Sequence, residues 1–462
     1  MKPLSLSRIA QACNGRLDGE DIVVDAVVTD SRGLRADSAA TLFVAIAGDT
    51  FDGHDHVAAA AAAGALAALV SRRVDAPLPQ VVVADTVAAL GSLAAALQAQ
   101  RSTQVVAITG SNGKTSVKQL LLPILSRCGR TYCNPGNRNN EIGLPLAVID
   151  APDDAEFAIY EMGAGQPGDI AYLTAIARPR VAVVNNVAPA HLERMGSLLG
   201  VADTKAAIYD ALPDDGTAVL NADDAFEPYF AERAHGRRLL RFGFDARADV
   251  RARDVVLRED GSAFVLVARE GEIAVSLPLP GRHNVANALA AAALALACGA
   301  GLDAIAAGLA GVEPVAGRLV RHRLPGGAWL VDDSYNANPG SLAAAIDILA
   351  AAPGEGWLVL GDMRELGADA MALHEAAGRR ARDAGVARLY AHGALSAVAA
   401  EAFGPGAAVF GSHAELAAAL ATALAAATPA TAAPTILVKG SRGSAMDRVV
   451  AALLTKDDTH AA

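Results

Sequence analysis

Short apolar runs alternate with stretches of helical periodicity along most of this 462-residue chain. The clearest run, residues 105–108, is bounded by polar and turn residues, and apolar positions at helical spacing follow over residues 117–125. A run of four apolar residues between turn signals is typical of a strand that is buried on both faces. The pattern therefore predicts a strand, a turn and a helix in direct succession.

The same alternation of strands and helices is found on both sides of this unit. Before it, residues 22–28 and 42–46 are predicted strands, and a helix through residue 98 leads into the run at 105–108. After it, residues 248–280 hold short alternating runs that predict an antiparallel ribbon. From Arg318 onward, strands separated by helical stretches are predicted at 329–332, 357–360, 388–391, 408–410 and 436–438. That order predicts a Rossmann-like α/β domain with right-handed crossovers.

A chain of this length is expected to form about three domains. Residues 312–317 have the composition of a linker. We therefore predict an α/β protein of three domains: a small N-terminal α/β domain (1–100), a central α/β domain built around the strand–turn–helix unit (101–313) and a C-terminal Rossmann-like α/β domain (314–462).

Composition narrows the class of protein. The net charge of −11 argues against nucleic-acid binding, and the four cysteines have no metal-binding or redox spacing. The longest apolar run, residues 57–70, contains Gly64 and is too short to span a membrane. The first residues lack the apolar core of a signal peptide. We expect a cytoplasmic protein without membrane insertion.

The turn after residues 105–108 has the composition of a phosphate-binding loop. It consists of Gly110, Ser111, Asn112, Gly113, Lys114, Thr115 and Ser116. Glycines let backbone N–H groups approach phosphates, and the following helix N-terminus adds partial positive charge. Lys114 would reach the β- and γ-phosphates, and the Thr115 hydroxyl would bind Mg²⁺. The loop departs from the common G-x-x-x-x-G-K-[ST] pattern, because Ile108 stands where the first glycine is expected.

Polar residues follow several of the other predicted strands, where α/β proteins tend to bind ligands. In the N-terminal part these are residues 29–32 and 48–54, for which ordinary turn chemistry is the alternative. Residues 134–143 are rich in amides, which bind sugars and peptide groups, although a plain surface loop has the same composition. Glu161 ends a buried strand where an acid that binds Mg²⁺ is expected, and a solvent-facing glutamate is the alternative.

Three further sites depend on single residues. His191 follows the strand at 181–184 and Lys205 lies on the next helix, but a structural histidine and a solvated lysine are the alternatives. Asn284 begins an Ala-rich helix and would serve equally as its N-cap. Lys439 and Arg442 lie just after a C-terminal strand, where a positive charge at a helix start opposes the helix dipole unless an anion is bound.

Eight motifs in this order resemble those of the Mur ligases, the ATP-dependent amino-acid ligases of peptidoglycan synthesis. They are G-S-N-G-K-T-S, N-x-N-N-E-I-G, Y-E-M-G, N-N-V-A-P-A-H-L-E-R-M-G-S, G-R-H-N-V-A-N-A-L-A-A, P-V-A-G-R-L, D-D-S-Y-N-A-N-P and V-K-G-S-R. They cover nearly the whole chain. The last two resemble the branch of the family that adds D-alanyl-D-alanine to UDP-N-acetylmuramoyl-tripeptide. The D-Y-A-H-x-P and D-N-P-R motifs of the branch that adds the third residue are absent.

The resemblance implies that residues 101–313 are a P-loop-type α/β domain that binds ATP, and that residues 1–100 bind the UDP-sugar peptide. It also implies a role for each set of residues. The UDP-sugar peptide would contact Ser31, Arg32, Asp52, Gly53, His54, Asn137, Asn139 and Asn140, with Lys439, Ser441 and Arg442 also at the substrates. ATP would contact the phosphate loop together with Asn284, Asn287, Arg318, Asp333 and Asn336. Mg²⁺ would be held by Thr115, Glu161, His191 and Lys205, the lysine being carbamylated by CO₂. Lys114, Lys205, His191 and Glu161 would be catalytic, and the protein would be a monomer.

The implied reaction proceeds through an acyl phosphate formed from ATP and the terminal carboxylate of the peptide. The sequence leaves three alternative functions open. The first is another Mur-type or folylpolyglutamate-type ligase, the second is an ATP-regulated binding or scaffold protein, and the third is a plain NTPase or motor. Against the last, no apolar run ending in a Walker B aspartate lies beside the loop.

Overall fold

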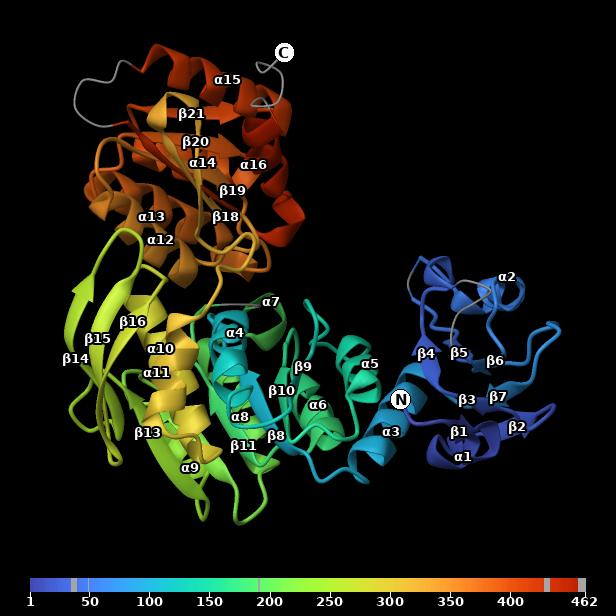
Figure 1. Ribbon diagram of the computed structural model, residues 1–462. Coiled ribbons are helices and arrows are strands. Elements are labelled where there is room, and N and C mark those ends of the chain that lie inside the picture. Colours follow the sequence, from blue (N-terminus) through green and yellow to red (C-terminus); the bar gives the residue numbers. More distant parts are fainter. Residues whose placement is uncertain (35–39, 49, 190–191, 428–432, 456–462) are drawn as a thin grey trace.

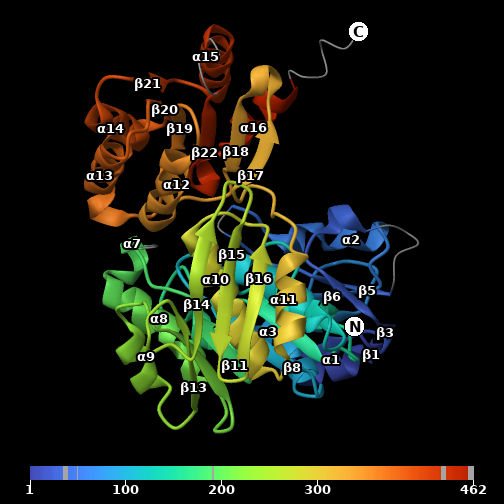
Figure 2. The same cartoon turned by 60° about the vertical axis from the view of Figure 1, so that its left-hand side comes forward.

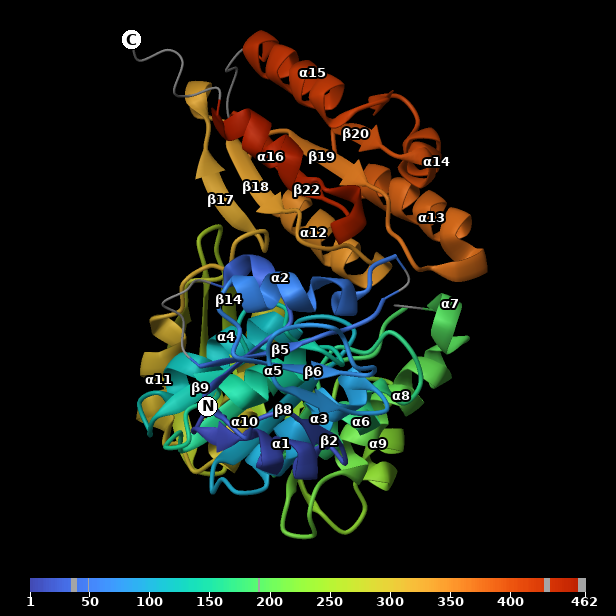
Figure 3. The ribbon, with the colours of Figure 1, turned by 90° about the vertical axis from the view of Figure 1, so that its right-hand side faces the viewer.

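The computed structural model describes residues 1–462 except 35–39, 49, 190–191, 428–432 and 456–462. The described chain is α/β throughout and builds three main sheets, which form three lobes (Figure 1). The N-terminal lobe lies beside the central one in Figure 1 and in front of it in Figure 3, and the C-terminal lobe lies above the central one in both views. No described helix is long and apolar enough to cross a membrane.

The N-terminal lobe contains a five-stranded sheet and a separate strand pair. The sheet order is β2 (Arg16–Asp18), β7 (Gln80–Val82), β6 (Ala67–Val70), β5 (Thr41–Val44) and β4 (Ala26–Val28), and β1 (Leu4–Ser5) pairs with β3 (Val23–Val24). Its helices are α1 (Leu6–Ala12) and α2 (Val57–Ala62), with single turns η1 (Ser31–Gly33) and η2 (Gly53–His56), and α3 (Thr86–Gln98) lies between this lobe and the central one. The strand expected over 22–28 is therefore two strands, because β3 pairs with β1 and β4 with β5.

The central lobe is organised around a nine-stranded sheet. Its order is β16 (Gly271–Leu277), β15 (Ser262–Ala268), β14 (Val250–Leu257), β13 (Arg238–Gly243), β12 (Thr217–Asn221), β11 (Val181–Val184), β8 (Gln104–Thr109), β10 (Phe157–Glu161) and β9 (Thr131–Cys133). The strands from β9 to β14 pair in parallel, and β14, β15 and β16 form the antiparallel ribbon expected from the sequence.

Helices cover both faces of the central sheet. The helices after α3 are α4 (Lys114–Leu125), α5 (Gly143–Asp150), α6 (Asp169–Ala177), α7 (Leu192–Met195), α8 (Leu198–Asp210), α9 (Glu227–Arg233), α10 (Arg282–Ala297) and α11 (Leu302–Ala310). Side chains of α4, α10 and α11 pack into one core. Those of α3, α5, α6 and α8 pack into another, which continues into the N-terminal lobe because α3 also contacts α1.

The C-terminal lobe is a six-stranded sheet between two layers of helices (Figure 2). The order is β17 (Val320–Arg323), β18 (Trp329–Asp333), β22 (Thr435–Lys439), β19 (Gly356–Gly361), β20 (Arg388–His392) and β21 (Ala407–Phe410), with only β17 antiparallel. One core is formed with α12 (Pro339–Ala351), α13 (Ala370–Asp383) and α14 (Ala394–Phe403), and the other with α15 (His413–Ala426) and α16 (Asp447–Leu454). Short turns are η3 (Pro325–Gly327), η4 (Gly367–Asp369) and η5 (Arg442–Ser444). All five predicted strands of this domain are present.

The carboxyl ends of parallel strands position the polar residues of the molecule. In the central sheet β10, β8 and β11 are neighbours, so the segments that follow Glu161, Thr109 and Val184 lie at one edge. In the C-terminal sheet β18 and β22 are neighbours, and the register pairs Asp333 with Lys439. Ligands of open α/β sheets bind outside such carboxyl ends.

Candidate functional site

A cavity of about 670 Å³ lies between the central and the C-terminal lobes. It collects most of the residues that the sequence singled out. Those that line it are Gly110, Ser111, Asn112, Gly113, Lys114, Thr115, Ser116, Asn139, Asn140, Glu161, Lys205, Asn284, Asn287, Arg318, Asp333, Asn336 and Lys439.

Other predicted site residues lie elsewhere. Ser31, Arg32, Asp52, Gly53, His54, Asn137, Ser441 and Arg442 do not line the cavity, and His191 lies outside the described residues. The five N-terminal residues instead follow β4 and β5, which are parallel neighbours, and so lie at the carboxyl edge of that sheet.

The phosphate loop begins at the end of β8 and ends at the N-terminus of α4. Gly113 has φ +79°, which other residues rarely adopt. A Cβ at this position would lie 2.4 Å from Asn287 Oδ1 and 2.5 Å from Asn185 Nδ2. The glycine therefore meets a steric requirement as well as a conformational one.

Two asparagines after β11 brace the loop. The Asn112 N–H donates to Asn186 Oδ1 at 2.8 Å, and Asn185 Nδ2 donates both to the Asn112 carbonyl and to Asn287 Oδ1, at 3.0 Å each. The Ser111 N–H donates to the Asn186 carbonyl at 2.9 Å. Asn185 and Asn186 were not predicted as site residues, although they directly follow the predicted strand at 181–184, and that position was the available signal.

Lys114 and Arg318 bring positive charge to the loop. The Lys114 ammonium donates to the Gly110 carbonyl at 2.7 Å, and burial, together with nearby Arg318, lowers the pKa of Lys114. Arg318 Nη2 donates to Thr115 Oγ1 at 2.9 Å, and its guanidinium lies 4.3 Å from the centre of the Tyr335 ring. The C-terminal lobe thus contacts the very hydroxyl that was predicted to bind Mg²⁺.

Glu161 is a buried carboxylate whose two oxygens are both hydrogen-bonded. Thr115 Oγ1 donates to Oε2 at 2.9 Å, Asn139 Nδ2 donates to Oε1 at 2.9 Å, and the Lys118 ammonium lies 3.3 Å from Oε2. Burial raises the pKa of Glu161, but Lys118, Lys114 and the two hydrogen bonds outweigh it, so the pKa lies below its ordinary value. The solvent-facing alternative is therefore wrong: Glu161 is 3% exposed.

Lys205 is a buried lysine on α8 that lines the same cavity. Its exposed fraction is 2%, and no described residue accepts a hydrogen bond from its amine. Burial, reinforced by Lys114 and opposed by Asp169, lowers its pKa from 10.5 to about 7. A solvated helix lysine, the alternative from the sequence, is excluded. At pH 7 a substantial fraction of the amine is therefore neutral, which an ordinary lysine is not.

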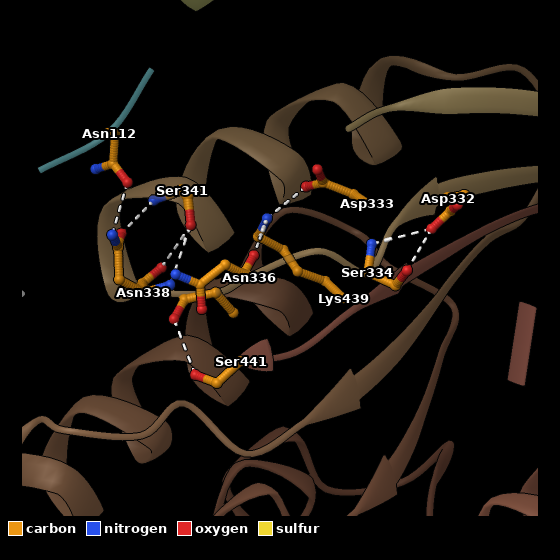
Figure 4. Close-up of polar contacts among 10 residues, drawn as sticks. Asn112, Asp332, Asp333, Ser334, Asn336, Asn338, Ser341, Lys439 and Ser441 are labelled. Carbon is orange, nitrogen blue, oxygen red and sulfur yellow. Dashed lines mark hydrogen bonds and ion pairs between the residues drawn. The ribbon is translucent and has the colours of Figure 1, made fainter. Parts of the chain in front are cut away.

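The C-terminal wall of the cavity is built on an ion pair between neighbouring strands (Figure 4). Lys439 Nζ lies 2.5 Å from Asp333 Oδ2 and donates to the Asn336 carbonyl at 3.0 Å. Burial raises the pKa of Asp333, and Lys439 opposes that rise. Lys439 is thus a strand-end residue with a carboxylate partner, and not an unpaired charge at a helix start.

Ser441 and Arg442 support this wall from outside the cavity. The Ser441 hydroxyl donates to the Ala337 carbonyl at 3.2 Å and accepts the Arg364 N–H at 2.8 Å. The Arg442 guanidinium lies 5.2 Å from the centre of the Tyr335 ring. Both residues hold the segment that carries Asn336.

A second direct contact between the lobes involves Asn338, which the sequence analysis did not single out. Its Nδ2 donates to Asn112 Oδ1 at 2.6 Å, while its own Oδ1 caps α12 by accepting the Ser341 N–H (Figure 4). The C-terminal lobe is therefore bonded to the phosphate loop itself.

Asn284 and Asn287 lie in the first turns of α10. The N-cap is Gly281, so Asn284 is not the cap. Asn284 Nδ2 donates to the Pro280 carbonyl at 2.8 Å. This bond holds the Asn284 side chain at the cavity wall.

The N-terminal candidates form an internally satisfied network. Asp52 accepts from the His54 N–H at 2.9 Å and pairs with His54 Nδ1 at 2.6 Å and Arg72 at 2.9 Å. Buried His54 accepts the Ser71 N–H at Nε2 at 2.9 Å. A Cβ on Gly53 would lie 2.7 Å from the Ile46 nitrogen. These contacts agree with turn chemistry that fixes this edge of the sheet. Arg32 is exposed and pairs with Asp30.

A parallel sheet with a phosphate loop, facing a second α/β domain across a polar cavity, defines a nucleotide-binding α/β protein. Family models described as the Mur ligase middle domain, the Mur ligase glutamate ligase domain and the Mur ligase family catalytic domain match residues 108–295, 317–442 and 23–99.

The comparisons with individual proteins agree with these models. UDP-N-acetylmuramoyl-tripeptide–D-alanyl-D-alanine ligase of Escherichia coli (strain K12) is 45% identical over 98% of this chain and 99% of its own. A crystal structure of MurF from Acinetobacter baumannii has a TM-score of 0.93 at 33% identity, covering 98% and 99%. MurF ligase from Thermotoga maritima in complex with ADP has a TM-score of 0.83 at 30% identity, covering 95% and 99%. The chain belongs to the Mur ligase family.

Proposed function

We propose that this chain is the ATP-dependent ligase that joins D-alanyl-D-alanine to UDP-N-acetylmuramoyl-tripeptide, giving the UDP-muramoyl-pentapeptide, ADP and phosphate. The observation that carries the proposal is that one cavity brings together the phosphate loop, the amide-rich loop with Asn139 and Asn140, and the Asp333–Lys439 pair. The Escherichia coli relative of that name supports the choice of substrates. The enzyme would act in the cytoplasm, as a monomer, in peptidoglycan synthesis.

The chemistry needs an activated carboxylate, because oxide is a poor leaving group. A terminal carboxylate oxygen of the tripeptide attacks the γ-phosphorus of ATP, and the bond to ADP breaks. The amine of the dipeptide then attacks the acyl carbon, phosphate leaves and the amine loses its proton. Lys114 supplies fixed positive charge where two anions must meet, which lowers the barrier in a site that excludes water. Closure of the C-terminal lobe would orient the reactants.

The described residues fit Mg²⁺ at the phosphate loop. Thr115 Oγ1 and Glu161 Oε2 are oxygen donors 2.9 Å apart. No group of three or more described acidic, histidine or cysteine side chains forms a metal cage. Mg²⁺ typically takes one or two protein oxygens and completes its shell with phosphates and water. When bound, it would offset the charge of the phosphates. Thr115 and Glu161 would hold this ion, with His191 as a further ligand, and Lys114 would add positive charge beside it.

Lys205 is proposed to carry a carbamate that supports a second Mg²⁺. Carbamylation requires a neutral amine, and the pKa of about 7 at Lys205 supplies one at neutral pH. A carbamate on this amine would be an anionic oxygen ligand of the kind that hard cations prefer.

The remaining roles complete the proposal. Nucleotide contacts are assigned to Gly110, Ser111, Asn112, Gly113, Ser116, Asn284, Asn287, Arg318, Asp333 and Asn336. Contacts to the UDP-sugar peptide are assigned to Ser31, Arg32, Asp52, Gly53, His54, Asn137, Asn139 and Asn140, and contacts to the reacting groups to Lys439, Ser441 and Arg442. The three domains would divide at residues 100/101 and 313/314.

Phosphate release with varied amines tests the function. The protein is incubated with ATP, Mg²⁺ and UDP-N-acetylmuramoyl-tripeptide, and the rate is compared for D-Ala-D-Ala, L-Lys, meso-diaminopimelate, D-Glu and L-Ala. The dipeptide should be the preferred acceptor, and the product should gain the mass of both alanines. A single amino acid that is clearly the better acceptor would make this chain a different ligase of the family.

A further inference from the structure

A third buried lysine lies beneath the cavity and has no role in the function proposed above. Lys118 is 1% exposed, on the turn of α4 that follows Lys114. Its ammonium donates to the Asn134 carbonyl at 2.9 Å and to the Gly136 carbonyl at 3.1 Å, and it lies 3.3 Å from Glu161 Oε2. Three acceptors thus match the three N–H bonds of one ammonium.

The acceptors come from two different parts of the site. Asn134 and Gly136 belong to the segment between β9 and α5 that continues to Asn139 and Asn140 at the cavity wall. Glu161 ends β10. The Lys118 side chain therefore joins the helix of the phosphate loop to the amide-rich loop and to the acidic strand end.

Side chains of the amide-rich loop also bond to Glu161, Asn134 at its backbone and Asn139 at its carboxylate. Asn134 Oδ1 accepts the Glu161 N–H at 3.0 Å, and Asn134 Nδ2 donates to the Glu161 carbonyl at 3.0 Å and to the Arg138 carbonyl at 2.8 Å. Asn139 donates to Glu161 Oε1. These bonds attach the amide-rich loop to Glu161. The loop is attached to α4 by different bonds, which Lys118 donates to the carbonyls of Asn134 and Gly136.

The distribution of lysine in the chain gives an independent reason to look here. The sequence contains 39 lysines and arginines, and only six of them are lysine. Arginine is therefore the usual basic residue of this chain. Lys2 lies near the N-terminus and Lys456 lies outside the described residues. The other four are Lys114, Lys118, Lys205 and Lys439, and three of these line the cavity. A planar guanidinium cannot direct three donors from one atom, which is what the site around Lys118 requires.

We propose that Lys118 is a positioning residue for the peptide substrate: it holds the loop of residues 134–140 in the conformation that receives the UDP-linked peptide, without contacting a substrate itself. The inference rests on the proposed function, because it takes that loop to bind the peptide. It differs from a role at the nucleotide, because Lys114 and the glycines of the loop remain in place when Lys118 is removed.

The test compares Lys118→Met with the wild type and with Lys2→Met, which removes an exposed lysine. Binding of UDP-N-acetylmuramoyl-tripeptide is measured by calorimetry in EDTA without nucleotide, so the readout needs neither metal nor turnover. We expect Lys118→Met to bind the tripeptide about tenfold or more weakly, in line with the loss of hydrogen bonds to a charged group. Its KM for the tripeptide should rise in parallel. Affinity for a non-hydrolysable ATP analogue and the KM for the dipeptide should stay within twofold.

The opposing results are specific. Folded Lys118→Met that binds the tripeptide as tightly as the wild type would overturn the inference. So would a defect confined to a raised Mg²⁺ requirement, since that would place the action of Lys118 on Glu161 alone. If Lys118→Met does not fold, Lys118→Gln, which keeps a donor, is judged by the same criteria. Wild-type protein that binds no UDP-linked tripeptide would instead refute the proposed function.

Discussion

Replacing Lys205 by methionine should make the protein more stable and abolish ligation. The amine is buried without a described hydrogen-bond partner, and its pKa is lowered from 10.5 to about 7. At about 1.4 kcal/mol per unit of pKa, burying the charged ammonium lowers the free energy of unfolding by roughly 5 kcal/mol. Methionine has a similar length and no charge. Because a protein relaxes around a buried charge, the expected gain in the free energy of unfolding is smaller, about 2 kcal/mol.

The pH dependence follows from the sign of the shift. Between pH 7 and 10.5 the unfolded chain binds a proton at Lys205 that the folded chain does not, so the stability contributed by this site falls as the pH is lowered through that window. Below the folded pKa the loss is complete and constant. The advantage of Lys205→Met should therefore be full at and below pH 7 and should shrink toward zero as the pH approaches 10.5.

Thermal unfolding in buffer free of CO₂ measures the effect. A gain of about 2 kcal/mol should raise Tm by roughly 4–8 °C for a cooperative unit of 150–250 residues. Lys2→Met, which changes an exposed lysine, should leave Tm within error. Added bicarbonate should raise the Tm of the wild type but not that of Lys205→Met if a carbamate forms. Short carboxylates such as acetate should partly restore ligation to Lys205→Ala. An unchanged or lowered Tm for Lys205→Met without CO₂ would refute the reasoning from burial.

Two further substitutions test the phosphate loop. Lys114→Ala should keep the fold and lose turnover by several orders of magnitude, because one fixed charge at a dry phosphate site stabilises the transition state by a few kcal/mol; near-normal phosphate release would contradict the assignment. Gly113→Ala places a Cβ 2.4 Å from Asn287 Oδ1 at a residue with φ +79°, so binding of an ATP analogue should weaken at least tenfold. The control is Gly136→Ala, which also has positive φ but has no atom within 4 Å of the added Cβ. Gly136→Ala should bind the ATP analogue normally, and equal weakening in both variants would contradict the argument from the clash.

The α/β fold follows from the sequence because its strands are short and buried on both faces. β11 and β22 are each buried at every position, so they appear as continuous apolar runs between turn residues. β9 was not predicted, because its three residues are only half-buried and do not form a continuous apolar run. The break between β3 and β4 also escaped, because the alternation of 22–28 continues through a change of partner strand.

The phosphate loop was predictable because its residues are contiguous in the sequence and follow a predicted strand directly. The contacts between this loop and the C-terminal lobe were not predictable from the sequence. Arg318 bonds to Thr115 across 203 residues of sequence, and Asn338 bonds to Asn112 across 226. Spacing carries no information at such separations. Lys118 had a weak signal, one helical turn after Lys114, but only its burial distinguishes it from a surface lysine.

Two of the contacts between the lobes, Arg318 to Thr115 and Asn338 to Asn112, use atoms that a nucleotide would compete for. Thr115 Oγ1 now accepts from Arg318 and donates to Glu161, so a metal ion on that oxygen would require at least one of these bonds to change. Asn112 lies in the phosphate loop, and its partner Asn338 caps α12. Each bond contributes only about 1 kcal/mol net, so exchanging them for bonds to phosphate costs little. Away from this site, Arg321 of the C-terminal lobe also donates to the Glu259 carbonyl of the central lobe at 2.8 Å. A ligand that replaced the Thr115 and Asn112 contacts would therefore change the lobe contacts at the nucleotide site and leave the Arg321 contact available as a pivot.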